Sequence, residues 1–322
     1  MPARLKTRFT EFFDIDCPVM LAPMDKVAGG ALAAAVTRAG GLGLLGGGYG
    51  DADWIEQAHR DAGNERVGIG FITWSVLRTP ELVDQALSHK PAALMVSFGD
   101  AEDIIAKAKA QDTPTIWQVH TVAQAEQAAK AGVDVIVVQG QEAGGHGMDR
   151  GLMALLPAAR DATGPDQIIL AAGGIADGRG LAGALMLGGD GIMMGTRFCA
   201  SAEADDTDIA KAGLVKATGD GTVRSKVFDV ARAVDWPWHF TGRVVRNAFA
   251  DKWVGNIEDM KMRAAEAQEA YNASQPDDHS IRALIAGEAV DFISRIEPAG
   301  DIVARIVEEA SDLLKRAPRY AE

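Results

Sequence analysis

The chain has 322 residues, of which 48% are hydrophobic and 24% are charged. This composition is that of an ordinary folded chain and excludes disordered, collagen-like and disulfide-scaffold proteins. Its 45 acidic and 32 basic side chains give a formal charge of −13, so the overall field repels nucleic acid and anionic membrane surfaces. The sequence therefore predicts no nucleic-acid partner and no membrane partner, and any bound phosphate has to be held by local geometry.

The cysteines and the N-terminal sequence indicate the compartment. Cys17 and Cys199 lie far apart without metal-ligand spacing, which fits a reducing compartment and predicts no metal site. Residues 1–20 lack the apolar stretch of a signal peptide, and no later segment reaches about 18 uninterrupted apolar residues. We therefore expect a cytoplasmic protein. The sequence leaves the oligomeric state open, with a homo-oligomer among the alternatives.

From Pro18 to about Ala200 the sequence repeats a short apolar run, a Gly or polar turn and an Ala-rich helical pattern, as βα units of a parallel sheet do. Eight strands are predicted, at Val19–Ala22, Leu42–Leu45, Val67–Ile72, Ala93–Ser97, Thr115–Val119, Val135–Val138, Ile168–Ala171 and Gly191–Met194. Helices are predicted between them, at Gly30–Ala39, Ala52–Ala62, Pro80–Ser88, Ala101–Ala110, Val122–Ala131, Leu152–Asp161 and Gly178–Leu187. This pattern predicts an α/β fold, a (β/α)8 TIM barrel.

The pattern changes after Ser201. Residues 205–298 show longer helical patterns without strand–helix alternation, and a last amphipathic pattern at Asp301–Arg316 is predicted to be the eighth barrel helix. We therefore predict a barrel made of residues 1–204 and 299–322. Residues 205–298 are predicted to form a helical extension after strand eight, on the substrate side of the barrel mouth.

Aromatic side chains gather in one part of this extension, at Trp236, Trp238, His239 and Phe240. They either wall an apolar substrate pocket or anchor the extension to the barrel. The sequence does not choose between these two interpretations.

Glycines follow the last two predicted strands, in residues 170–179 (LAAGGIADGR) and 194–197 (MGTR). Gly173 and Gly174 lack Cβ atoms, so backbone N–H groups can approach an anion there, and Asp177 is placed to cap the next helix. Many (β/α)8 enzymes bind phosphate at the loops after strands seven and eight. The two loops together therefore predict a phosphate site, rather than two tight turns alone.

A Gly-rich loop, residues 139–147 (QGQEAGGHG), follows the sixth predicted strand. Its glycines allow His146 to lie at the barrel mouth, above flat backbone that suits a planar ligand. At this place His146 can act as a base or as a cation. His120, just after the fifth strand, either supports the site or packs inside the barrel. For Glu142 we favour a helix cap or an ion pair over a general acid.

Six segments together resemble the nitronate monooxygenases, formerly called 2-nitropropane dioxygenases. They are Ala22–Met24, Ala31–Gly43, Val96–Gly99, Gln139–Gly147, Ala171–Arg179 and Met194–Phe198. The resemblance extends from the first strand to about Phe198 and implies FMN at the barrel mouth. Flavin-dependent enoyl-acyl-carrier-protein reductases and NADH:quinone reductases carry similar motifs. The resemblance therefore indicates fold and cofactor better than substrate.

The resemblance also implies roles for individual residues, and His146 matches the active-site histidine of the family. The cofactor-binding residues near the flavin ring are Pro23, Met24, Asp25, Gln118, Gln139, Gly144 and Gly145. Those that hold the ribityl phosphate are Ala172, Gly173, Gly174, Gly195 and Thr196. Asp25-Lys26 and Gly70–Thr73 depart from the pattern of relatives at the expected mouth, which leaves substrate size and charge open.

The implied function is that of an FMN-dependent nitronate monooxygenase, with an alkyl nitronate and O2 as partners and a carbonyl compound and nitrite as products. The alternative is an NAD(P)H-dependent flavin reductase acting on a quinone or an enoyl thioester, although the sequence shows no separate site for a pyridine nucleotide. A third hypothesis is a flavin-free, phosphate-binding barrel.

Overall fold

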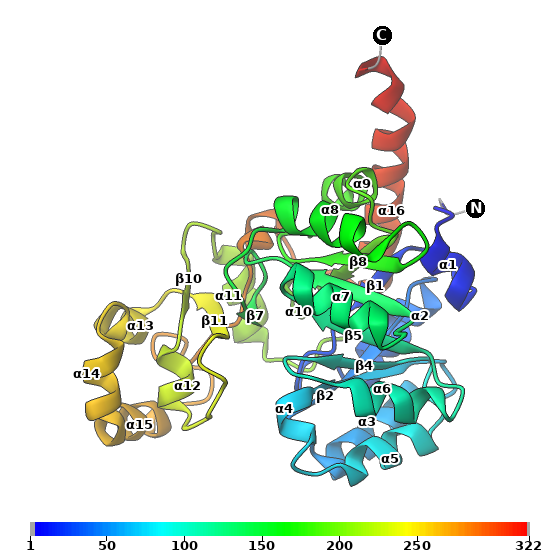
Figure 1. Cartoon of the computed structure of the whole chain (residues 1–322). Helices are drawn as coiled ribbons and strands as arrows, with labels where there is room; N and C mark the ends of the chain where they lie inside the picture. The colour runs from blue at the N-terminus through cyan, green and yellow to red at the C-terminus, as the bar shows by residue number, and fades with distance from the viewer. Residues whose placement is uncertain (1–3, 321–322) are drawn as a thin grey trace.

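The computed structural model describes residues 4–320 and is built around eight parallel strands (Figure 1). These are β1 (Val19–Leu21), β2 (Leu44–Gly48), β3 (Gly68–Ile72), β4 (Leu94–Ser97), β5 (Thr115–Val119), β6 (Val135–Gln139), β8 (Ile168–Ala172) and β9 (Gly191–Met194). The sheet order, β1-β9-β8-β6-β5-β4-β3-β2, follows the chain around a ring. A parallel bridge between Met20 and Leu42 joins the two edge strands. The predicted (β/α)8 barrel is confirmed.

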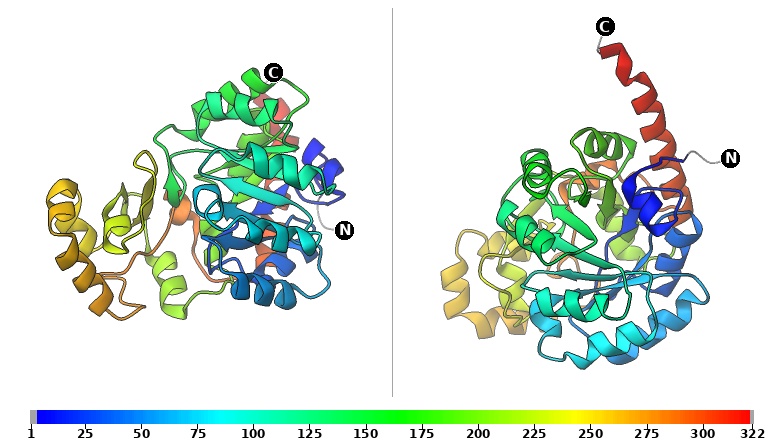
Figure 2. Two further views of the ribbon diagram at one scale, coloured as in Figure 1. Left: turned by 60° about the horizontal axis from the view of Figure 1, so that its bottom comes forward. Right: turned by 45° about the vertical axis from the view of Figure 1, so that its right-hand side comes forward.

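Helices cover the outside of the strands, as the two views in Figure 2 show. They are α2 (Gly30–Arg38), α3 (Ala52–Ala62), α4 (Thr73–Val76), α5 (Glu81–Ser88), α6 (Glu102–Lys109), α7 (Val122–Lys130), α8 (Leu152–Thr163), α9 (Gly178–Met186), α10 (Thr196–Cys199) and α16 (Ala299–Arg316). Helix α16 packs against both α9 and α2, the place that the eighth helix of a barrel takes. A short 3-10 helix, η2 (Ala317–Tyr320), follows it.

Two apolar layers hold the barrel together, because successive side chains of a strand point to opposite faces. In β6, Val135 and Val137 belong to the cluster inside the barrel, whereas Ile136 and Val138 belong to the cluster under the helices. The inner cluster also contains Phe9 and Phe13 of α1 (Arg8–Phe13). Helix α1 thus closes one end of the barrel and leaves the opposite end available for a site.

Residues 205–298 form an extension lobe on the side of the molecule away from α1 (Figure 1). The lobe contains α11 (Asp208–Lys216), β10 (Thr222–Ser225), α12 (Val227–Ala231), β11 (Thr241–Val245), α13 (Ala248–Trp253), α14 (Ile257–Met262), α15 (Ala264–Ala273) and η1 (Glu288–Phe292). Phe228, Phe249 and Trp253 are among the side chains of its own apolar core. The sequence had predicted a helical extension. The lobe differs from this prediction because it also contains the strands β10 and β11.

The strands that sequence reasoning missed belong to a small antiparallel sheet of order β10-β11-β7. Its third strand, β7 (Gly145–Gly147), is part of the Gly-rich loop after β6. These strands are short and only half buried, and β7 has the sequence GHG. No apolar alternation marks them, because the pairing depends on the lobe docking against the loop.

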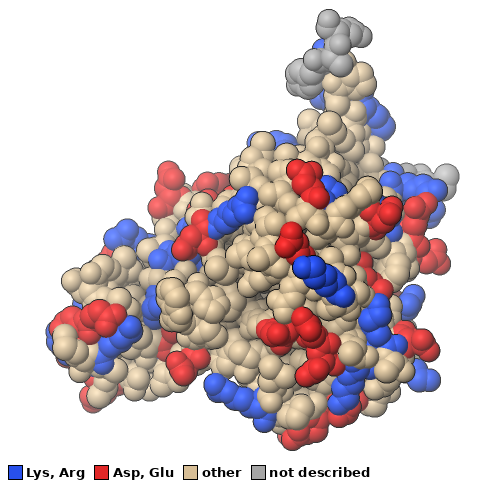
Figure 3. Space-filling model, in the orientation of Figure 1, with Lys and Arg blue, Asp and Glu red and all other residues tan. Residues whose placement is uncertain are grey.

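Among residues 4–320, no helix combines the length and the apolar character needed to cross a bilayer. On the face shown in Figure 3, acidic and basic side chains are interspersed rather than gathered into one continuous patch. Cys17 and Cys199 are both buried and unpaired with each other. Within the same described range, no cluster of three or more His, Cys, Asp or Glu side chains is arranged to hold a metal ion.

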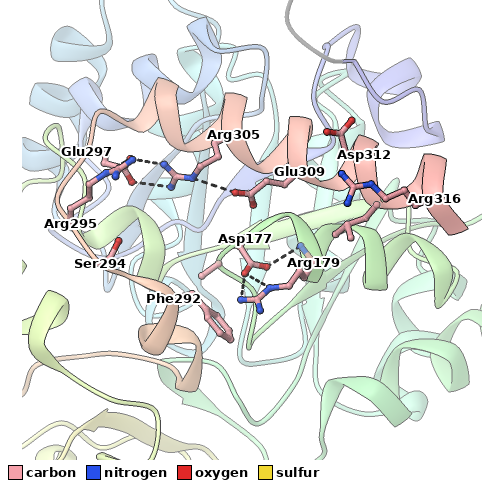
Figure 4. A pocket seen from close by; sticks show the side chains of 12 residues that line it. Asp177, Arg179, Phe292, Ser294, Arg295, Glu297, Arg305, Glu309, Asp312 and Arg316 are labelled. Carbon is pink, nitrogen blue, oxygen red and sulfur yellow. Dashed lines mark hydrogen bonds and ion pairs between the residues drawn. The ribbon is translucent and has the colours of Figure 1, made fainter.

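An ion network connects the end of the barrel to its last helix. It borders a hollow of about 610 Å³ on the outer surface beside α9 and α16 (Figure 4). The carboxylate of Glu297 accepts hydrogen bonds from Arg305 Nη2 at 2.9 Å, from Arg295 Nε at 2.8 Å and from Arg197. The side chain of Arg197, in α10, is only 1% exposed. Hydrogen bonding from Arg305, followed by that from Arg295, lowers the pKa of Glu297 to about 2.

We expect Glu297→Gln to lower the free energy of unfolding by about 3 kcal/mol, because the guanidinium of Arg197 would stay buried without a charged partner. The exposed residue Glu308 lies on the same helix, and Glu308→Gln should change this free energy by less than about 0.5 kcal/mol. A lowered carboxyl pKa stabilises the native state above the ordinary value of 4.5, and this contribution is lost as pH falls toward 2. Urea unfolding at several pH values measures it. A difference between wild type and Glu297→Gln that did not shrink between pH 5 and pH 3 would contradict this assignment.

Candidate active site

A cavity of about 280 Å³ lies at the carboxyl ends of the barrel strands, and the extension lobe contributes to its wall. Every residue that the sequence predicted for the site lines this cavity. They are Pro23, Met24, Asp25, Gln118, Gln139, Gly144, Gly145, His146, Ala172, Gly173, Gly174, Gly195 and Thr196. The structure thus brings together residues from the ends of five barrel strands, β1, β5, β6, β8 and β9, and their individual roles in binding stay predictions.

Glycines line the corner of the cavity at the carboxyl ends of β8 and β9. Gly173 and Gly174 follow β8 with φ angles of +98° and +70°, a conformation that side chains with a Cβ rarely adopt. The predicted cap is present, since the carboxylate of Asp177 accepts hydrogen bonds from Arg179 N (2.9 Å) and Gly180 N (3.2 Å). With little side-chain bulk, this corner can bring peptide N–H groups close to an anionic group.

The lobe returns to this corner through residues 284–289. Gly287 N–H donates to Thr196 Oγ1 at 2.9 Å, and Glu288 N–H donates to Glu142 O at 2.9 Å. The carboxylate of Glu142 points elsewhere and accepts from the backbone N–H of Leu152, the first residue of α8, at 3.0 and 3.1 Å. Glu142 is therefore a helix cap, as the sequence favoured.

Two arginines of the small sheet fix the Gly-rich loop. Arg224 Nη2 donates to Gln141 O at 3.0 Å and to Ala143 O at 2.8 Å, and Arg243 Nη2 donates to Gln141 O at 3.1 Å. Burial lowers the pKa of Arg224 to about 10, which leaves its guanidinium charged at neutral pH. Side chains of the lobe therefore fix the position of the loop that carries His146.

His120 lies behind the cavity and contacts two of its predicted residues. Its Nε2 lies 2.7 Å from Gln139 Oε1 and 3.3 Å from Gln118 Nε2, and its side chain is buried. Burial lowers the pKa of His120 to about 4, so the ring is neutral near pH 7. Of the two interpretations left open by the sequence, the structure favours a supporting role, in which His120 Nε2–H donates to Gln139 Oε1 and orients that amide, while Gln118 lies beside it.

His146 lies on β7, where pairing with β11 places it opposite Gly242. Its Nε2 is 2.8 Å from Asp229 Oδ1, and its ring stacks on Trp236 with centroids 3.5 Å apart and planes 6° apart. Burial lowers the pKa of His146, although the carboxylate of Asp229 acts in the opposite direction. The histidine is therefore oriented by two lobe residues.

A second polar group of the cavity wall connects the barrel to the lobe. Tyr49, just after β2, accepts hydrogen bonds through its hydroxyl oxygen from Trp236 Nε1 at 2.8 Å and from Arg232 Nη2 at 3.3 Å. Burial raises the pKa of Tyr49 and also that of Asp25, which lines the same cavity. Arg232 therefore brings a positive charge to a poorly solvated wall.

The aromatic residues of the lobe divide into two groups. Trp236 lines the cavity and packs against Phe98 and Trp74, with ring centroids at 5.0 and 5.2 Å, so it both walls the pocket and anchors the lobe. Phe240 packs on Phe98 at 5.2 Å. Trp238, in contrast, is 85% exposed and does not line the cavity.

Sequence reasoning missed Tyr49, Asp229 and Arg232. Tyr49 lies in the Gly-rich run that follows the second predicted strand, so its place at a strand end was the signal that could have indicated it. Asp229 and Arg232 stand in an ordinary helical pattern, and Asp229 is 83 positions from His146. Only the docking of the lobe brings these side chains into the site.

Comparison with known proteins agrees with this arrangement. The family model described as nitronate monooxygenase matches residues 6–64 and 73–309. The chain is 32% identical to the nitronate monooxygenase of Neurospora crassa, over 94% of this chain and 92% of that protein. It is 33% identical to nitronate monooxygenase npaC of Metarhizium robertsii, over 92% of this chain and 91% of that protein.

Among solved structures, FabK from Thermotoga maritima is similar, with a TM-score of 0.85 and 28% identity over 98% of this chain and 99% of that chain. The sequence matches span both the barrel and the lobe, and thus include the Gly-rich loop with its histidine and the lobe that orients it. The protein is accordingly an oxidoreductase, and the chain belongs to the nitronate monooxygenase family.

Proposed function

We propose that the protein is an FMN-dependent nitronate monooxygenase that oxidises an alkyl nitronate with O2 to a carbonyl compound and nitrite. The observation that carries this proposal is the convergence of the two Gly-containing strand ends and the His146 loop on one cavity, in a chain of this family. Two nitronate anions and one O2 balance two carbonyl compounds and two nitrite ions in atoms and charge. The overall reaction therefore needs no external reductant.

The family consists of flavoproteins, and we propose that FMN is the flavin that this cavity binds. A Cβ atom at Gly145 would have only Ile285 within 4 Å, at 3.6 Å, and a Cβ at Gly195 would lie 3.3 Å from Met24 Sδ. Both positions line the cavity, so side chains there would take up space that a flat ring needs. We propose that Ala172, Gly173, Gly174, Gly195 and Thr196 hold the phosphate, and that Pro23, Met24, Asp25, Gln118, Gln139, Gly144 and Gly145 surround the ring.

When bound, FMN would supply the electron acceptor, and the chain's own residues would orient and protect the reactants. Trp236 and Phe98 exclude water from one side of the cavity, which strengthens every charge interaction within it. His146 is the proposed catalytic residue. Residues 205–298 would thus be the substrate-side part of the enzyme, because Trp236 and Arg232 belong to them.

The likeness to FabK supports a second candidate, an NAD(P)H-dependent flavin reductase. The sequence comparisons favour the first. The family model described as nitronate monooxygenase matches residues 6–64 and 73–309, and two relatives named nitronate monooxygenase are 32% and 33% identical to this chain. FabK is 28% identical.

Anaerobic mixing of the purified yellow protein with one reductant at a time separates the candidates. We expect a preformed nitronate to bleach the visible absorbance of the flavin, and NAD(P)H to bleach it far more slowly. Fast bleaching by NAD(P)H alone would support the reductase instead. A colourless protein that gains no absorbance on incubation with FMN would contradict both candidates and favour the flavin-free barrel.

A further inference from the structure

The cavity wall formed by Tyr49 and the lobe contains a cation without an ion-pair partner. Arg232 donates through Nε to Phe228 O at 3.3 Å and through Nη2 to Tyr49 Oη at 3.3 Å, and both acceptors are uncharged. In the described part of the chain, no carboxylate lies within ion-pair distance of Arg232. Asp25 lines the same cavity and interacts with Arg232 only from farther away, and burial raises the pKa of that carboxyl. Since Arg232 lines the cavity, its remaining N–H groups are available to an anionic ligand there.

The hydroxyl of Tyr49 adds a second donor beside this guanidinium. A phenol oxygen has two acceptor positions and one hydrogen. Trp236 Nε1–H and Arg232 Nη2–H occupy the two acceptor positions, at 2.8 and 3.3 Å. Within residues 4–320, no protein acceptor receives the hydroxyl hydrogen, and Tyr49 lines the cavity. The O–H is thus free to donate to the same ligand as Arg232.

Whereas Arg232 and Tyr49 donate hydrogen bonds, His146 can accept a proton from a ligand in the cavity. An ionised carboxylate only accepts hydrogen bonds, so the 2.8 Å contact with Asp229 Oδ1 places a hydrogen on His146 Nε2. In the neutral ring, Nδ1 then carries the lone pair and can accept a proton. Lys226 Nζ forms an ion pair with the same carboxylate, 3.4 Å from Asp229 Oδ2. Burial is the largest cause that lowers the pKa of His146; Arg232 and Lys226 act in the same direction, and Asp229 acts against them.

We propose that Arg232 and Tyr49 bind the oxygen atoms of the nitronate, and that Asp229 positions His146, the catalytic residue proposed above, so that its Nδ1 faces the α proton of substrate that arrives as the nitroalkane. This inference rests on the proposed function. It assigns binding of the anion to Arg232 and Tyr49, and acceptance of the proton to His146. In the proton transfer, the α C–H bond breaks and an N–H bond forms at His146 Nδ1. The electron pair of the C–H bond becomes the C=N bond, and the negative charge moves to the nitro oxygens beside Arg232.

The anion site is tested with Arg232→Met, Arg232→Lys and Tyr49→Phe in the flavin-containing protein. Nitrate, a planar oxyanion, is the probe in calorimetric titration, and ethyl nitronate is the substrate. We expect Arg232→Met to weaken nitrate binding and to raise KM for ethyl nitronate by about tenfold or more, the scale of a hydrogen bond to a charged group. Arg232→Lys should keep nitrate affinity and KM for ethyl nitronate close to the wild-type values. Tyr49→Phe should weaken nitrate binding less than Arg232→Met does.

Arg246→Met is the matched control, because Arg246 is an exposed lobe arginine paired with Asp251 away from the cavity. It should leave nitrate binding and KM unchanged. Wild-type nitrate affinity in Arg232→Met would overturn the anion site whether or not the protein oxidises nitronates. If instead the wild type bound nitrate through Arg232 and oxidised no nitronate, the proposed function would fail and the anion site would stand.

The orienting role of Asp229 has its own readout. Asp229→Asn should reduce kcat for nitroethane more than kcat for ethyl nitronate, because only the nitroalkane has to lose a proton. The carboxylate of Asp229 raises the pKa of His146, so its removal should move the acidic limb of the nitroethane pH profile to lower pH. Equal losses for both substrates with an unmoved profile would mean that Asp229 has only a structural role.

Discussion

His146→Asn should reduce the turnover of a neutral nitroalkane by about 100-fold or more, the usual contribution of a general base. Asparagine keeps a hydrogen-bonding group near Asp229 but has no nitrogen that accepts a proton at neutral pH. Flavin should stay bound, since the proposed phosphate site lies at Gly173, Gly174 and Gly195. Steady-state rates with nitroethane and with ethyl nitronate measure the effect, and the loss with the nitronate should be much smaller.

The pH dependence provides a second measurement for this variant. A base works in its unprotonated form, so wild-type turnover of nitroethane should rise with pH and level off above the pKa of His146, which burial lowers. His89→Asn, a change at an exposed histidine, is the control. Undiminished activity of His146→Asn with both substrates would remove this residue from the mechanism. The next residue to test would be His120, which contacts Gln118 and Gln139.

Gly174→Val should yield folded protein with little or no bound flavin. Gly174 has φ +70°, and a Cβ atom there would lie 3.1 Å from Glu142 Cβ. A β-branched side chain at this φ costs on the order of 1–3 kcal/mol, and relieving this strain would move the backbone of the proposed phosphate site. Visible absorbance per mole of folded protein, with circular dichroism as the check on folding, measures the effect.

The matched control for this change is Gly63→Val. Gly63 has φ +64°, and a Cβ atom added there meets no atom within 4 Å, so the variant has the same backbone strain away from the cavity. It should lose some stability and keep its flavin. Full flavin content in folded Gly174→Val would place the phosphate elsewhere in the molecule.

The barrel could be predicted from the sequence because its signals are local. Each strand is a short run buried on both faces, as in β6 with Val135–Gln139, and each helix is an amphipathic pattern such as Ala52–Ala62. The observed bounds of the eight predicted barrel helices agree with the predicted ones to within two residues, whereas the short helices α4 and α10 were not predicted. The strand-end glycines could be placed in one site for the same reason, since all parallel strands of a barrel end at the same rim.

The remaining part of the site depends on contacts between distant segments. Arg232 and Tyr49 are 183 positions apart, and no motif or period relates them. Likewise, β10 and β11 are half-buried strands of mixed composition whose pairing with β7 follows from the docking of the lobe. The sequence therefore indicated where the histidine lies but not which residues orient it.

Closure of the barrel joins the two ends of the chain, and this governs the order in which the protein can fold. Strand β1 pairs with β9 through Val19 and Ile192, and α16 fills the space between α2 and α9. On the ribosome, one side of the first strand stays unpaired until residues more than 170 positions later are made, and the apolar sides of α2 and α9 stay uncovered until α16 emerges. Such long-range contacts slow folding and expose apolar surface to aggregation. A chain that ends before Ala299 should therefore depend on chaperones and be degraded quickly, although every residue of the proposed flavin site would already have been synthesised.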